Sequence, residues 1–152
     1  MIKDKYKELE IYMNKDDADR VNEIFKEILE EAFKIINNKI ENKKSFDISN
    51  EEDLYAVRAM FEYMLELWDE GSLKEAREVG YDMLYLVDDK KLKEMFSMFV
   101  IGMLAGLSLD EFFEKYVKLD SLYKDFFFVD FNDEIDELVI KYQDKFKEEF
   151  SE

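Results

Sequence analysis

Apolar residues recur three and four positions apart along most of the chain, which is the period of helices with one buried face. The pattern predicts a first short helix near 2–13 and a second helix that fades near 37–38. Two further helices are predicted over 50–70 and 73–87, joined by a turn at Gly71. So short a connection is typical of antiparallel neighbours.

The segment 95–107 differs from all the others because its thirteen residues carry no charge. A helix that is apolar on every side must be surrounded by protein or lipid, and spanning a bilayer needs about 17–25 apolar residues. The run is too short to span, so we expect a central helix at about 89–107 with amphipathic helices around it. Gly102 and Gly106, four residues apart, predict close helix crossing on one side of it.

Beyond the apolar run, the periodicity predicts helices from 109 to 117 and from about 133 to 150. Between them the run 126–129 is aromatic, and its pattern fits a strand, a tight helical turn or a loop. The whole chain is therefore predicted to be an all-α, single-domain bundle (1–152) of seven or eight helices.

Helix starts are marked by polar residues that can accept hydrogen bonds from the first turn. Three positions have the spacing of a capping box, in which a Ser and a Glu three residues later bond each other's backbone. These pairs are Ser49 with Glu52, Ser72 with Glu75, and Ser108 with Glu111. Three further caps are predicted at Asp16 or Asp17, at Asp88–Asp89 and at Asn132–Asp133.

The segment 37–49 is polar and relatively rich in lysine, and we expect it to be a mobile loop or a frayed helix end. Phe46 is the residue that would hold it to the core. On the second helix, Glu30 and Lys34 have the spacing of an i,i+4 ion pair.

Composition narrows the chemistry that the chain can perform. It has no histidine and no cysteine, so Ser-His and Cys-His nucleophiles, disulfides and the commonest metal ligand are excluded. The opening residues carry charge in place of a secretory apolar core, which predicts a cytoplasmic protein. A net charge of −17 repels nucleic acid and anionic membranes and attracts basic partners.

Carboxylates and tyrosines share the polar sides of the third and fourth predicted helices. On a helical projection these acids lie opposite the apolar stripe, so they are expected to face solvent. Tyrosine is enriched in protein contact surfaces and its ring attracts cations, although a tyrosine can also cover a neighbouring helix. The predicted partner-binding residues are Tyr55, Glu62, Tyr63, Glu66, Glu70, Glu78, Tyr81, Asp82 and Tyr85.

The stretch 78–86, with Glu78 and Asp82, resembles the acidic helix of all-α nucleotide pyrophosphatases, which pair ExxE with a later ExxD. Glu78 and Asp82 depart from that pattern because they are four residues apart. The resemblance implies a Mg²⁺-dependent nucleotide hydrolase in which carboxylates hold the metal. Its ligands would be Glu66, Asp69, Glu78 and Asp82.

The sequence as a whole favours a non-enzymatic acidic interaction module, such as an adaptor, small chaperone or assembly factor. Its partner would be a protein with a basic or amphipathic surface, and we expect no catalytic residue, metal, cofactor, membrane contact or direct nucleic-acid binding. One alternative is a nucleic-acid mimic that blocks a nucleic-acid-binding protein with its carboxylates. The nucleotide hydrolase is the other, and the oligomeric state stays open.

Overall fold

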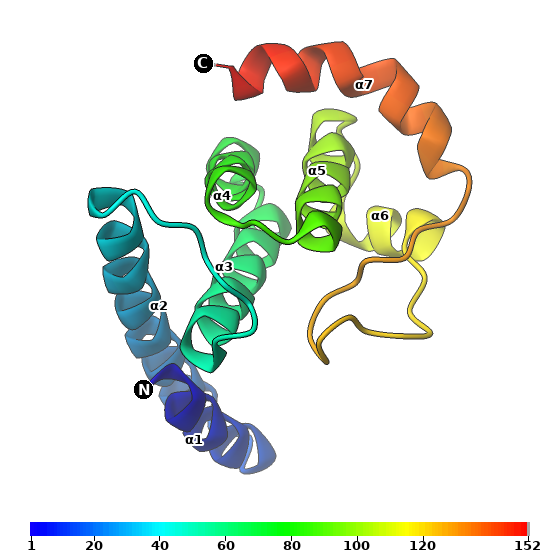
Figure 1. Cartoon of the computed structure of the whole chain (residues 1–152). Coiled ribbons are helices and arrows are strands. Elements are labelled where there is room, and N and C mark those ends of the chain that lie inside the picture. Colours follow the sequence, from blue (N-terminus) through cyan, green and yellow to red (C-terminus); the bar gives the residue numbers. More distant parts are fainter. Residues whose placement is uncertain (152) are drawn as a thin grey trace. The chain divides into compact units, whose positions relative to one another are not determined.

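In a computed structural model, which describes residues 1–151, the chain forms seven α-helices and no β-strand (Figure 1). Their order is α1 (Ile2–Asn14), α2 (Ala18–Glu41), α3 (Glu51–Asp69), α4 (Leu73–Leu86), α5 (Lys90–Leu104), α6 (Leu109–Tyr116) and α7 (Ile135–Phe150). The predicted all-α helical bundle is therefore confirmed. None of these helices is long and apolar enough to cross a membrane.

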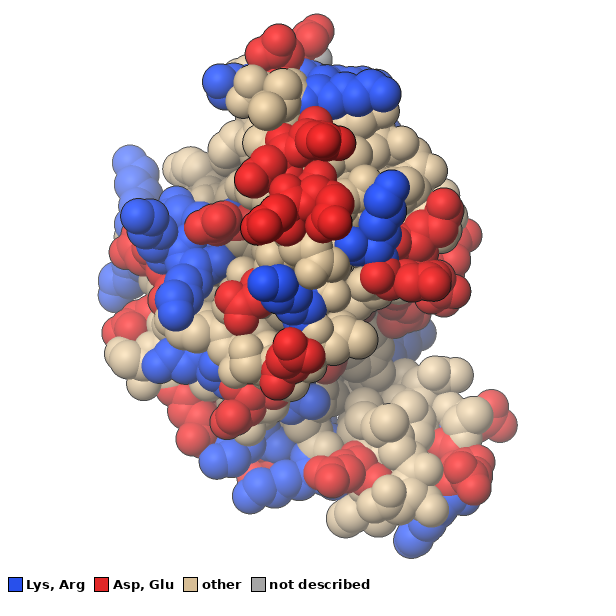
Figure 2. Space-filling model, turned by 90° about the vertical axis from the view of Figure 1, so that its right-hand side faces the viewer, with Lys and Arg blue, Asp and Glu red and all other residues tan. Residues whose placement is uncertain are grey.

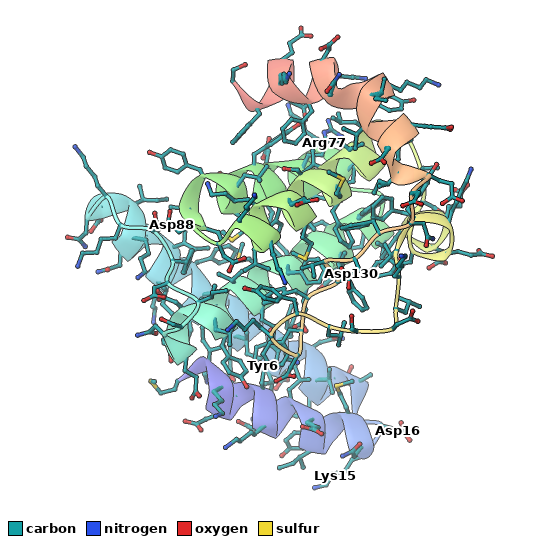
Figure 3. All side chains as sticks on the ribbon, turned by 45° about the vertical axis from the view of Figure 1, so that its right-hand side comes forward. Tyr6, Lys15, Asp16, Arg77, Asp88 and Asp130 are labelled. Atoms are coloured by element: carbon teal, nitrogen blue, oxygen red, sulfur yellow. The ribbon has the colours of Figure 1, made fainter. Side chains whose placement is uncertain are left out.

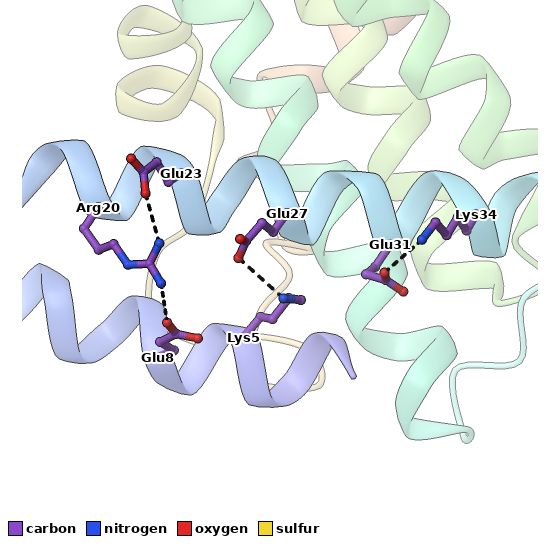
Figure 4. Close-up of polar contacts among 7 residues, drawn as sticks. All are labelled: Lys5, Glu8, Arg20, Glu23, Glu27, Glu31 and Lys34. Carbon is purple, nitrogen blue, oxygen red and sulfur yellow. Dashed lines mark hydrogen bonds and ion pairs between the residues drawn. The ribbon is translucent and has the colours of Figure 1, made fainter.

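The chain divides within α3 into two compact units, Met1–Met60 and Phe61–Glu152, and each is described by itself. In the first unit α1 packs against α2, and both helices bury an isoleucine stripe that includes Ile2, Ile24 and Ile28. Ion pairs join the polar edges of the two helices, Lys5 with Glu27 at 3.4 Å and Arg20 with Glu8 at 2.9 Å (Figure 4).

Two sequence-based details of the first unit are wrong. Lys34 pairs with Glu31, one turn away at 3.3 Å, in place of Glu30 (Figure 4). The second helix also continues to Glu41, so the first part of the segment 37–49 is helical. The rest of that segment is held at Phe46, which is 1% exposed, and its mobility stays a prediction.

Asp53 fastens the end of this segment to α3. It is the one buried charged residue among those described, at 6% exposure, and it accepts hydrogen bonds from Lys39 Nζ at 2.8 Å and from the backbone N–H of Asp47 at 2.9 Å. A buried charge needs such partners, because an unpaired carboxylate away from water costs several kcal/mol, on the order of 3–5.

In the second unit the predicted apolar helix is α5, and nine of its fifteen residues are buried. Phe99 is fully buried and Ile101 is 3% exposed. The helix packs against α4 and α7, and in Figure 1 α7 crosses both of them. Burial of this helix is as predicted, whereas its central position in the whole chain stays a prediction.

Aromatic rings fill the space around α5. Phe99 lies 5.2 Å from Phe61 and 5.0 Å from Phe112 between ring centroids, and Trp68 lies 5.3 Å from Phe112. Phe127 lies in the aromatic run 126–129, for which the sequence pattern fits a strand, a helical turn or a loop. It is fully buried, and its ring centroid lies 5.8 Å from that of Phe61. This segment is a turn closed by an isolated antiparallel bridge between Tyr123 and Phe127, which settles the ambiguity in favour of a loop.

Of the three predicted capping boxes, one is confirmed. Ser108 and Glu111 bond each other's backbone N–H at 3.1 Å. At the start of α3 the cap is Asn50, whose side chain accepts from the N–H of Asp53, because Ser49 bonds Asp47.

The capping box predicted at Ser72 and Glu75 is wrong, because the Ser72 side chain makes no cap bond to α4.

Of the three caps predicted at single sites, two are confirmed and one is wrong. Asp17 and Asp89 accept from the first turns of α2 and α5 as predicted. At the start of α7, however, Asn132 is used elsewhere, since its side-chain amide donates to the backbone carbonyl of Lys115.

The two glycines of the apolar run have different roles. A Cβ on Gly102 would lie 2.5 Å from the ring of Phe112 and 3.0 Å from Trp68, so two aromatic side chains, and not the backbone of a crossing helix, approach this glycine. Gly106 has nothing within 4 Å; it has φ of +77° and ends the helix, which corrects the prediction for that residue.

We expect Gly102→Ala to lower the free energy of unfolding by about 1–3 kcal/mol, because two rigid rings must move to admit the methyl group. This range is net of a gain of about 1 kcal/mol in helix propensity, because a contact of 2.5 Å with an aromatic ring puts the packing cost at the upper end of the usual range or above it. Chemical denaturation measures the change, with Ser97→Ala on the same helix as a control of nearly unchanged stability. An unchanged or higher midpoint for Gly102→Ala would contradict the tight contact.

Candidate functional site

The nine predicted partner-binding residues are divided between the two units. Eight lie in the second unit, seven of them on α3 and α4 and Glu70 directly after α3, whereas Tyr55 lies on the part of α3 that belongs to the first unit. Tyr55 packs there on Tyr6, with ring centroids 5.8 Å apart, and its ring also lies 5.8 Å from the Arg58 guanidinium. Tyr55 thus covers a neighbouring helix within its own unit.

The position of the acids on α4 follows from the face that this helix buries. Val79, Gly80 and Met83 are buried against the core, and a Cβ on Gly80 would lie only 2.6 Å from the Val100 side chain. The opposite face must therefore point outward. Glu78 and Asp82 are exposed there, as the helical projection predicts.

A groove of about 370 Å³ runs between α4 and the last turn of α7. Its walls are mainly aromatic and acidic. The lining residues are Lys74, Glu78, Tyr81, Asp82, Tyr85, Glu149 and Phe150. Four predicted partner-binding residues therefore meet in one concave site, and helix α7 supplies its second wall.

The wall formed by α7 is fixed by an ion pair from α4. Arg77 Nε donates to Glu149 Oε1 at 2.6 Å and Nη2 donates to Oε2 at 3.3 Å, while the Tyr81 hydroxyl also donates to Oε1 at 2.8 Å. Arg77 lies on α4, on the side toward α7 (Figure 3). Two-pronged pairs of this kind are directional, so they position α7 as well as hold it.

Burial pushes the pKa of Glu149 upward, but the hydrogen bonds from Arg77 and Tyr81 and the positive charge of Arg77 outweigh it. The net effect is a pKa below the ordinary value of 4.5. Glu149 is therefore ionised and internally neutralised at neutral pH, and it contributes little free charge to the groove.

Tyr81 forms the aromatic floor together with the end of α7. Its ring stacks on Phe150 with centroids 5.3 Å apart and meets Phe146 edge-on at 5.7 Å. Tyr85, one turn further along α4, is 78% exposed at the groove's rim. Tyr81 thus serves mainly to hold α7, whereas Tyr85 presents its ring to solvent.

The carboxylate of Asp82 differs from that of Glu149 because no cation neutralises it. Its place in the groove, where contact with water is reduced, raises its pKa, and the nearby Glu78 carboxylate raises it further. Within residues 1–151, neither acid forms an ion pair with a Lys or Arg side chain. The groove therefore holds two carboxylates that form no ion pair, although Lys74 also lines it.

The remaining predicted residues form a second acidic group around Tyr63 on α3. Partial burial raises the pKa of the Tyr63 hydroxyl, and the charges of Glu75, Glu66 and Glu70 add to the effect. Partial burial and Glu70 likewise raise the pKa of Glu66. We name the five acids Glu62, Glu66, Glu70, Glu78 and Asp82 the α3–α4 acidic face. On the side of the molecule that Figure 2 shows, acidic side chains gather in clusters with basic side chains between them.

Asp69 and the three acids proposed with it as metal ligands do not form a metal site. Among residues 1–151, no group of three or more Asp and Glu side chains converges in a way that could hold a metal ion. Glu66, Asp69, Glu78 and Asp82 are all exposed, and only Glu78 and Asp82 line the same groove. The nucleotide-hydrolase hypothesis gains no support from this geometry.

Lys74, Arg77, Glu149 and Phe150 belong to the site but were not predicted from the sequence. Residues on α7 lie some 70 positions from α4 in the chain, as the separation of 72 between Arg77 and Glu149 illustrates. No local pattern signals a contact at that separation. The one signal in the sequence is Arg77, which lies among the acids of the fourth helix. Its guanidinium has five donors in a rigid plane and so favours a carboxylate partner.

Comparison with known proteins finds no family model that matches this chain, and no similar curated protein or solved structure.

Replacing Glu149 by Gln should lower the free energy of unfolding by about 0.5–1 kcal/mol at neutral pH, because a half-exposed charge-assisted pair is lost. The pKa of Glu149 is lowered by folding, so this contribution is present above about pH 4.5 and disappears as pH falls through the lower folded value. Thermal melts of both proteins between pH 7 and 3 measure the difference. A gap that stays constant down to pH 3 would contradict the assignment.

Proposed function

We propose that this protein is a non-enzymatic, cytoplasmic interaction module that binds a partner protein with a basic or amphipathic surface through its α3–α4 acidic face. The observation that supports this best is the groove between α4 and α7, where acids without internal partners adjoin an exposed tyrosine. A concave, partly aromatic site of this kind is the usual form of a binding site.

The charge of the face favours a basic partner over an acidic or neutral one. Complementary charges accelerate encounter and exclude wrong partners, while a central aromatic side chain supplies most of the affinity. Partial burial raises the pKa of Glu66 and of Asp82, and the nearby carboxylates of Glu70 and Glu78 raise them further, so part of the cost of these charges is repulsion within the face. A bound cation would relieve that repulsion, which favours the complex.

The test compares partner capture by tagged full-length protein with capture by a variant of the α3–α4 acidic face. The variant replaces Glu62, Glu66, Glu70, Glu78 and Asp82 by their amides. We expect the wild type to retain a basic protein from lysate of the source cells, and the variant to retain it about tenfold less well, since complementary rim charges govern association. Raised salt should weaken capture in the same direction.

The matched control removes the same five charges from exposed positions of the first unit: Asp4, Glu10, Asp19, Glu30 and Glu41. Its capture should equal that of the wild type. Equal loss in both variants would indicate a general charge effect and overturn the proposal. Displacement of the captured protein by duplex DNA would instead favour the nucleic-acid mimic.

A further inference from the structure

We propose that the groove between α4 and α7 binds one face of a basic amphipathic helix, with an arginine against Glu78 and Asp82 and a large apolar side chain against Tyr85 and Phe150. This inference rests on the proposed function and names the partner's chemistry at one site. It commits to a helix that carries both residue types one turn apart.

The fold leaves two large aromatic side chains partly uncovered at the groove. Phe150 is 41% exposed although one face of its ring stacks on Tyr81, and Tyr85 is 78% exposed. Two large rings that adjoin one concave space present an apolar surface that water solvates poorly. An aliphatic or aromatic side chain from the partner would cover it.

The acids of the groove differ in whether a partner within the chain already neutralises them. Glu149 is held by Arg77 and Tyr81, so its charge is satisfied within the chain. Glu78 and Asp82 lie four residues apart on α4, which places them one above the other on the same helix face. Lys74 lines the same groove but forms no ion pair with either acid.

Arginine fits this pair better than lysine. Its planar guanidinium has five donors, bridges two carboxylates and stacks on an aromatic face, whereas the lysine ammonium is a single point charge. On the neighbouring turn of α4, Arg77 already forms a two-pronged pair with one carboxylate, Glu149, whose Oε1 also accepts a hydrogen bond from the Tyr81 hydroxyl. Asp82, whose pKa is raised by partial burial and by Glu78, would be stabilised in its charged form by such a partner.

The size of the groove agrees with two side chains of a helix. Its volume of about 370 Å³ lies near the lower limit of the range of about 300–1,000 Å³ that ligand sites span. Residues three or four apart on a helix project from one face, so an arginine and an apolar residue at that spacing can enter together. This mode is the common one for helix-in-groove recognition.

The experiment uses a fluorescein-labelled, alanine-based helical peptide with leucine and arginine four residues apart, titrated with the full-length protein and followed by anisotropy. We expect binding that weakens about tenfold when the peptide's arginine becomes glutamine, and similarly when its leucine becomes alanine. Amide chemical shifts should change at Tyr81, Asp82, Tyr85 and Phe150.

On the protein, the double variant Glu78→Gln and Asp82→Asn should bind the peptide about tenfold more weakly, and so should Tyr85→Ala. All three side chains are exposed, so thermal melts should show intact folding. The matched controls are the exposed pair Asp110→Asn and Glu114→Gln on α6, and Ile140→Ala on α7, where Ile140 is 71% exposed. These controls should bind like the wild type.

No peptide binding up to about 1 mM, a value typical of a negligible interaction, would overturn the inference. Unchanged affinity in the groove variants, or shift changes confined to Glu62, Glu66 and Glu70, would overturn it too, while leaving the proposed function in place. If the peptide binds in the groove but the protein captures no basic protein from lysate, the helix-binding groove is supported and the proposed cellular function is overturned.

Discussion

Edge-to-face packing of aromatic rings around Phe99 is the interaction on which the second unit depends. The Phe99 ring is fully buried and meets rings from α3, α6 and the segment after α6, including Phe61 at 5.2 Å and Phe131 at 6.0 Å between centroids. Each such ring buries a large apolar area and adds a geometric preference of about 0.5–1.5 kcal/mol per pair. Because the rings are rigid, the helices that carry them have little freedom to shift, and Gly102 is required where Phe112 and Trp68 approach the α5 backbone.

This core determines which face of α4 is available for function. With Val79, Gly80 and Met83 committed to the interior, the acids and tyrosines of α4 must face outward. Helix α7 then crosses α4 and α5 and is held differently from the other helices of the unit. Only Ile135 among its sixteen residues is buried, and its far end is positioned by the bonds of Glu149 with Arg77 and Tyr81. The groove exists because α7 rests on α4 through a few large rings and one ion pair, and those contacts leave space beside them.

Acids of the second unit fall into two kinds, those whose pKa the fold lowers and those whose pKa it raises. Glu149 is neutralised within the chain, and its pKa is lowered despite partial burial. Glu66 and Asp82 have raised pKa values because reduced solvation and a neighbouring carboxylate both oppose their charge. The folded state therefore tolerates repulsion on the α3–α4 acidic face. This contrast adds to the geometry of the groove between α4 and α7, on which both proposals rest.

The sequence by itself determined the all-α class, the approximate helices, and the outward direction of Glu66, Glu70, Glu78 and Asp82, because these follow from the 3.6-residue period and the need to bury apolar side chains. It also identified the capping box at Ser108, where both partners are local. It failed where a local pattern competes with a distant partner, as at Ser49, which bonds Asp47, and at Asn132, which bonds the carbonyl of Lys115. Only the tertiary structure decided that α7 forms the second wall of the groove and that Glu149 is paired while Asp82 is not. Those facts depend on contacts between residues about 70 positions apart, for which no periodicity in one chain carries a signal.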